Sequence, residues 1–148
     1  MAGALTARFD LPAEPRAAGR ARRLVSELLA AWNRAETIEV AQLLVSEVVT
    51  NAVRFVGDRG ALSLSVTLSI DRIRIAVDDG SSLHPDLRAV ADDDESGRGM
   101  HLVAALALQW GVVDRPQEQG TGKQVWFDLP RQPDPPRQEG PLEATCGA

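Results

Sequence analysis

A strict alternation of apolar and polar residues over two neighbouring segments limits the fold more than any other feature of the chain. In residues 62–70, Leu, Val and Ile alternate with Ser and Thr, and in residues 73–77, Ile and Val alternate with Arg and Ala. Period two is typical of a β-strand, and a single polar face indicates a sheet that is covered on one side only. The short link at Asp71-Arg72 predicts an antiparallel pair.

The other segments predict three helices and three more strands. Apolar residues at helical spacing follow Pro15 and recur over residues 38–55, and a third helix is expected from about Gly99 to Gln109. The further strands are expected over residues 5–11, 110–115 and 123–129. The resulting order, β-α-α-β-β-α-β-β, predicts an α/β (α+β) two-layer sandwich, with three helices on one face of a mixed, largely antiparallel sheet.

Length, charge and composition restrict the class of protein. The 148 residues suit one domain, expected over residues 1–130, and residues 131–148 form a Pro-rich tail that we expect to be disordered. The net charge of −5 argues against direct binding of nucleic acid. Cys146 has no second cysteine to pair with, and no apolar run is long enough to span a membrane. We therefore expect a soluble, cytoplasmic protein.

A carboxylate and a carboxamide, Glu47 and Asn51, lie one helical turn apart in the largely apolar segment 43–53. Positions i and i+4 share one helix face, where buried polar groups are costly unless they meet a ligand, an ion or each other. The oxygen of Asn51 suits Mg²⁺, and Glu47 is placed to orient or deprotonate a hydroxyl that attacks a phosphate. The alternative to a ligand site is that both side chains lie at the edge of the helix and form hydrogen bonds with the backbone.

Three downstream signals are weak when taken singly. Asp79, just past a strand end, can accept a hydrogen bond from the amino group of adenine, although Asp-Gly is also an ordinary turn. By strand alternation Asp78 should point the other way. Gly97 and Gly99 precede an apolar helix whose start can bind phosphate. Two cations, Arg98 and Lys123, are candidates to neutralise phosphate charge, or are ordinary surface residues.

In order, these motifs resemble the GHKL ATPases, the histidine-kinase-like ATPase family. The series is E-x-x-x-N on a helix, V-x-D at a strand end, G-x-G-[LM] opening a helix and G-x-G-K before a last strand, over about residues 5–130. Within that family, the phrases LLVSEVVTNAVRF and GRGMHLVAALALQWGV look most like the stand-alone anti-sigma-factor serine kinases of actinobacterial type.

The resemblance implies a Bergerat-type ATP-binding fold that uses ATP and Mg²⁺. It implies that Glu47 is the catalytic base, that Asn51 binds the metal and that Asp79 reads adenine. The residues implied to contact the nucleotide are Asn51, Asp79, Gly97, Arg98, Gly99, Met100 and Lys123. The chain departs from the family at Phe55, where members often carry His, and at Lys123, where sensor kinases have Thr. The D-x-G-x-G box that starts at Asp79 lacks both of its glycines.

The function that the resemblance implies is an ATP-dependent serine/threonine kinase that regulates transcription. It would phosphorylate an anti-sigma-factor antagonist and bind a sigma factor, and a homodimer is left open. The alternative is a nucleotide-dependent protein-binding switch with little or no phosphate transfer. A sensor histidine kinase would need a phosphoacceptor His on an upstream helix, and residues 1–37 contain no His.

Overall fold

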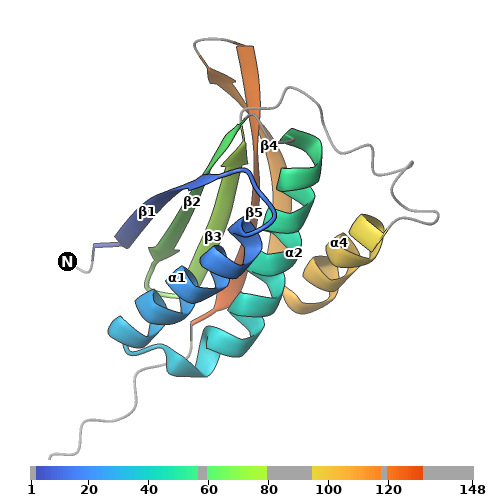
Figure 1. The fold of residues 1–148 in the computed structure, drawn as a ribbon. Helices are drawn as coiled ribbons and strands as arrows, with labels where there is room; N and C mark the ends of the chain where they lie inside the picture. The colour runs from blue at the N-terminus through green and yellow to red at the C-terminus, as the bar shows by residue number, and fades with distance from the viewer. Residues whose placement is uncertain (1–2, 57–59, 80–94, 118–119, 132–148) are drawn as a thin grey trace, which may run out of the picture.

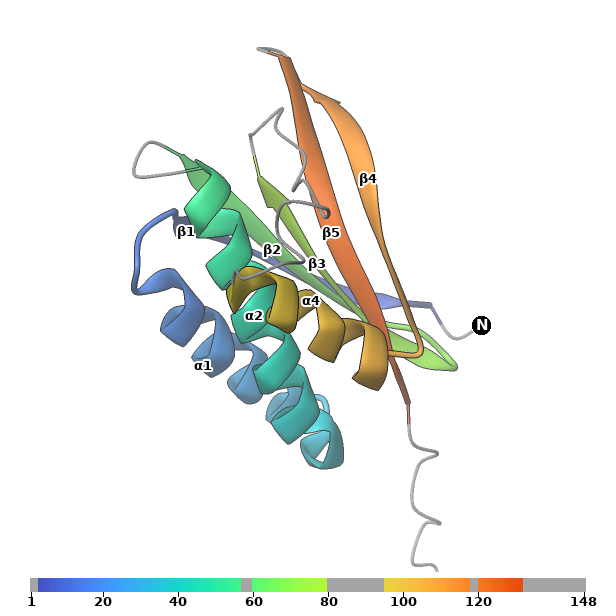
Figure 2. The same ribbon diagram turned by 90° about the vertical axis from the view of Figure 1, so that its right-hand side faces the viewer.

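The chain forms two layers, with three α-helices packed on one face of a five-stranded sheet (Figures 1 and 2). The computed structural model describes residues 3–56, 60–79, 95–117 and 120–131. The elements in chain order are β1 Leu5–Pro12, α1 Ala17–Ala31, the 3₁₀ turn η1 Ala35–Thr37, α2 Ile38–Val56, β2 Ala61–Leu68, β3 Arg72–Asp79, α4 Glu95–Leu106, β4 Gln109–Gln117 and β5 Gly120–Pro130. This order confirms the predicted two-layer sandwich.

The sheet has the strand order β1-β2-β3-β5-β4. All four pairings between the described strands are antiparallel, so the described sheet is antiparallel rather than mixed. The predicted hairpin is confirmed: β2 pairs with β3, and the Ser69 N–H donates to the Arg72 carbonyl across the turn at 2.9 Å. The expectation that the apolar row extends to Ile70 is wrong, because this residue lies in the turn and its side chain is 79% exposed.

The core lies between the inner face of the sheet and the two long helices. The helices contribute small and branched side chains, among them Ala17, Ala21, Val25, Leu29, Leu44, Val45 and Val48, all at most 1% exposed. The central strands contribute alternate residues, among them Leu64, Val66, Ile73, Ile75 and Phe127, which are also fully buried. The small residues on α1 let this helix lie close to the sheet, and each fully buried Val, Leu or Ile stabilises the fold by about 1.5–3 kcal/mol.

The end of α1 fixes where α2 begins. Asn33 adopts a left-handed backbone conformation with φ of 61°, which Asn tolerates better than most residues. The Asn33 N–H donates to the Ala30 carbonyl, and the Arg34 N–H donates to the Leu29 carbonyl at 2.7 Å. This pair of bonds is a Schellman motif, which ends one helix and reverses the chain. The η1 turn follows at once and leads into α2, so that α1 and α2 pack side by side.

Several predicted boundaries need correction. The third helix begins at Glu95 and ends at Leu106, rather than running from about Gly99 to Gln109. The last two strands are longer than predicted, and Gly120 to Gly122 belong to β5 rather than to a loop. The D-x-G-x-G box beyond Asp79 and the tail after Arg131 lie outside the described residues. Among the helices of the described segments, none is long and apolar enough to cross a membrane.

Candidate functional site

Glu47 and Asn51 lie on the flank of α2 that faces α4. The buried face of α2 consists of Ala41, Leu44, Val45, Val48, Val49 and Ala52. The flank towards α1 is marked by Ser46, whose Oγ accepts a hydrogen bond from Arg22 Nη1 at 2.8 Å. Gln42 Nε2 on the same flank donates to the Arg22 carbonyl at 3.2 Å. At about 100° per residue, Glu47 and Asn51 fall on the opposite flank, and both are half-buried.

The opposite flank of α2 is the one covered by α4. Figure 1 shows α1 and α4 on opposite sides of α2, and α4 packs against α2. The carboxylate and the carboxamide are therefore placed beside the helix that carries the glycine pair. Both side chains are partly exposed on this flank.

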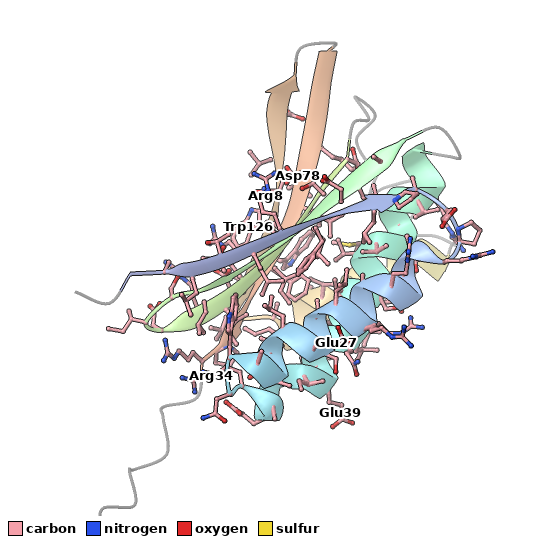
Figure 3. The ribbon with its side chains drawn as sticks, turned by 60° about the vertical axis from the view of Figure 1, so that its left-hand side comes forward. Arg8, Glu27, Arg34, Glu39, Asp78 and Trp126 are labelled. Atoms are coloured by element: carbon pink, nitrogen blue, oxygen red, sulfur yellow. The ribbon has the colours of Figure 1, made fainter. Side chains whose placement is uncertain are left out.

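Asp79 ends the inner row of β3 with a buried carboxylate. This row consists of Ile73, Ile75, Val77 and Asp79, and Asp79 is only 2% exposed. The neighbouring Asp78 points to the outer face of the sheet (Figure 3). There Gln124 Nε2 donates to both of its oxygens at 3.2 Å. The predicted alternation of the two aspartates is thus confirmed. An acidic side chain at the end of an apolar row is costly, so a buried partner or ligand is expected there.

The structure pairs Asp79 with Lys123. The register of β3 and β5 sets the two residues directly opposite each other, and Lys123 Nζ lies 3.6 Å from Asp79 Oδ2. The two side chains are 2% and 1% exposed. Burial lowers the pKa of the Lys123 ammonium, and the negative charge of Asp79 and hydrogen bonding to it offset only part of this effect. Lys123 is therefore not a surface cation.

The glycine pair lies within the first turns of α4, because this helix begins at Glu95. The first backbone N–H groups of a helix have no acceptor inside the helix, and the helix dipole favours an anion there. Gly97 and Gly99 place no side chain over this start. Met100 is 8% exposed and belongs to the core, so it anchors α4 onto the sandwich. The side chain of Arg98 lies outside the described part of the chain.

The donor and acceptor groups are of the kinds that a nucleotide with its metal requires. Figures 1 and 2 show the last turn of α2 and the end of β3 at the same end of the molecule. There Asp79 offers an acceptor for a base, and Asn51 offers an oxygen ligand of the kind that Mg²⁺ takes. The start of α4 offers N–H groups for phosphates. The roles of Glu47, Asn51 and Asp79 in binding remain predictions.

The pairing of Asp79 with Lys123 was not predicted from the sequence. Alternation alone predicts that Lys123 shares a face with Val125 and Phe127, which is a usable signal for its burial. The partner was not readable, because the two residues are 44 positions apart and their contact depends on the pairing of β3 with β5. Sequence analysis also missed a polar cluster on the outer face of the sheet, where Asp128 is fully buried under Arg74 and Gln109.

The chain belongs to the family of histidine kinase-like ATPase domains, since the model of that family matches residues 11–129. This match covers every element from the last residues of β1 to nearly the end of β5. Membership implies a domain that binds ATP. A comparison with curated proteins found no match.

Two solved structures illustrate the similarity. The histidine kinase domain of the blue-light activated histidine kinase from Erythrobacter litoralis EL346 is 22% identical, with a TM-score of 0.48 over 77% of this chain. This chain spans 59% of the length of that structure. The catalytic domain of the histidine kinase ThkA, in a nucleotide-free form, is 13% identical, with a TM-score of 0.49 over 88% of this chain and 99% of its own length.

Proposed function

We propose that this protein is an ATP-dependent serine/threonine kinase that phosphorylates an anti-sigma-factor antagonist and binds a sigma factor. The observation that carries the proposal is the placement of Glu47 and Asn51 together on the α4-facing flank of α2, in a chain of the histidine kinase-like ATPase family. The family supports ATP binding. The specialised partners are supported by the two sequence phrases around Glu47 and Met100 that resemble anti-sigma-factor kinases.

Each residue of the proposed site has one task. Asp79 accepts a hydrogen bond from the amino group of the base, and Asn51 offers its carboxamide oxygen to Mg²⁺. The N–H groups at the start of α4 hold the phosphates. When bound, Mg·ATP supplies the phosphoryl group that is transferred. A buried carboxylate beside the base favours adenine, whose exocyclic amino group is a donor.

Glu47 supplies the proton-transfer chemistry. A serine or threonine hydroxyl is a weak nucleophile unless a base accepts its proton, and a carboxylate within hydrogen-bond reach does this. Glu47 is half-buried, one turn from Asn51, so it lies near the metal-binding oxygen and remains accessible to a protein substrate. This placement supports transfer to a hydroxyl on a partner protein.

The test is a phosphotransfer assay with radiolabelled ATP and with the partner recovered by pull-down from the native organism in Mg·ATP. Glu47→Ala should abolish labelling of the partner and leave ATP affinity unchanged within roughly twofold. Asn51→Ala should reduce both labelling and binding, because it removes the metal ligand. Glu39→Ala is the matched control, since Glu39 is an exposed carboxylate in the first turn of the same helix (Figure 3).

Two results would count against the kinase. If Glu47→Ala labels the partner as fast as the wild type does, Glu47 is not the base. If the wild type binds Mg·ATP and captures a partner but transfers no label to it, the protein is a nucleotide-dependent binding switch instead.

A further inference from the structure

Lys123 is the only lysine in the chain, and its position does not suit a general role in neutralising phosphate. Its side chain is 2% exposed and lies on the inner face of the sheet, opposite the carboxylate that is proposed to read the base. Burial of an ammonium group is costly, and an ion pair offsets this cost only in part. Selection of a lysine at this buried position therefore calls for a role that an apolar residue cannot fill.

We propose that Lys123 is a second base-reading residue, which donates a hydrogen bond to the ring nitrogen N1 of adenine while Asp79 accepts from the adjacent amino group. The inference rests on the proposed function, because it assumes that the base binds at Asp79. It places Lys123 at the base rather than at the phosphates. It also makes the Asp79–Lys123 pair the element that sets the choice of nucleotide.

The chemistry of the two side chains matches one edge of adenine. That edge presents a donor, the exocyclic amino group, directly beside an acceptor, N1. A carboxylate only accepts hydrogen bonds and an ammonium only donates them, so the pair presents the complementary order. Hypoxanthine and guanine present a carbonyl and a ring N–H at the same two positions, which reverses the order. ITP should therefore bind more weakly than ATP.

The contact between the two residues keeps the carboxylate and the ammonium group side by side. Hydrogen bonds from nitrogen to oxygen are typically about 2.7–3.2 Å long, whereas Nζ and Oδ2 lie 3.6 Å apart. These two atoms therefore form an ion pair rather than a short hydrogen bond. The cross-strand register keeps both heads at the same end of the inner row.

The first experiment uses the wild-type chain and three nucleotides, titrated by calorimetry in Mg²⁺. The probes are ATP, 1-deaza-ATP, in which N1 is replaced by a carbon, and 7-deaza-ATP, in which N7, on the other side of the amino group, is replaced by a carbon. Loss of a hydrogen bond to a charged donor should weaken 1-deaza-ATP by roughly tenfold or more. The affinity for 7-deaza-ATP should match that for ATP within roughly twofold.

Two variants then assign the effect to Lys123. Lys123→Met keeps the length of the side chain and removes its donor, so it should bind ATP and 1-deaza-ATP equally and weakly. Lys123→Gln retains an N–H donor and should recover part of the preference for ATP. Gln124→Met is the matched control, because Gln124 lies one residue along β5 with its side chain on the outer face, against Asp78. Thermal melts show whether each variant is folded.

The outcomes separate this inference from the proposed function. If the wild type binds no Mg·ATP, the proposed function fails and the inference falls with it. If the wild type binds ATP and 1-deaza-ATP equally, the inference alone is wrong. The inference is also wrong if Lys123→Met keeps the wild-type preference for ATP over 1-deaza-ATP. It is wrong as well if this variant binds ATP more tightly than the wild type does, since the lysine side chain would then block the site rather than read the base. The comparison of nucleotides on the wild type needs no variant to fold.

Discussion

Replacement of Asp128 by Asn should destabilise the protein through the outer face of the sheet. Asp128 points away from the helices, yet it is fully buried, because side chains from both neighbouring strands cover it. Arg74 donates to its two oxygens from Nε at 2.7 Å and from Nη2 at 2.9 Å. Gln109 Nε2 donates to Oδ2 at 2.7 Å. A carboxamide of the same shape would turn an N–H group towards one of these donors.

The magnitude follows from the number of bonds and the exposure of the partners. A hydrogen bond to a charged group contributes about 1.5–3 kcal/mol to stability. The side chain of Arg74 is 40% exposed, so after the substitution it can bond to water and recover part of this energy. We therefore assign about 1 kcal/mol to each of the three bonds. The carboxamide keeps one acceptor oxygen, but the loss of charge weakens the bonds that remain, so we expect a loss of about 2–3 kcal/mol in the free energy of unfolding. The corresponding fall in melting temperature is about 10 °C.

The assay is urea unfolding of the wild type and the variant, with Asp78→Asn as control. Asp78 also lies on the outer face, but its contacts to Gln124 are 3.2 Å long and half-buried, so its replacement should cost under about 1 kcal/mol. If Asp128→Asn costs no more than the control, the cluster around Asp128 does not stabilise the fold as argued here.

Acidification provides a second check on Asp128. Burial raises the pKa of this carboxyl, but the hydrogen bonds from Arg74 and Gln109 and the charges of Arg74 and Arg72 outweigh it, so the net pKa is lowered. A lowered pKa in the folded state gives stability that is present above the ordinary value of about 3.9 and is lost as the pH falls below it. The stability difference between the wild type and Asp128→Asn should therefore shrink below about pH 4. A constant difference at every pH would contradict the assignment.

Three further predictions concern other parts of the molecule. Gly111→Ala should lower the free energy of unfolding by about 1–3 kcal/mol in chemical denaturation, because a Cβ at this position would lie 2.9 Å from Cζ2 of Trp126. The Trp126 ring cannot move away easily, since Cζ of Arg74 lies over it, 4.1 Å from the ring centroid. The pKa of Lys123 is lowered in the folded state, so the unfolded chain binds the lysine proton more tightly. The free energy of unfolding should therefore rise as the pH rises towards about 10.4, the ordinary pKa of lysine, and this rise should vanish in Lys123→Met. Arg131 donates from Nη1 to the Ser69 carbonyl at 2.9 Å, so the expected domain boundary at Pro130 is one residue too early. A chain that ends at Arg131 should melt at the same temperature as the full chain, and a drop of several degrees would show that the rest of the tail packs on the domain.

The hairpin and the long helix were predictable because their information is local. Period two from Leu62 to Leu68 and a helical apolar pattern across α2 each report on a single element and the face that it buries. The predicted start of α4 is too late, because a glycine pair favours a helix boundary, whereas here the glycines lie within the first turns. The burial of Asp128 was unpredictable, since it depends on side chains from two other strands. The pairing of Asp79 with Lys123 was unpredictable for the same reason, since it depends on which strands are neighbours in the sheet.

The most direct test of the account is a calorimetric titration of the wild type and Asp79→Asn with ATP, with Mg²⁺ present and with Mg²⁺ removed by a chelator. The account predicts saturable binding that weakens when the metal is removed. It predicts a further loss of roughly tenfold or more in Asp79→Asn, in which one acceptor oxygen becomes a donor. No heat at millimolar ATP, or equal binding by a folded Asp79→Asn, would contradict the claim that this end of the sheet reads an adenine nucleotide.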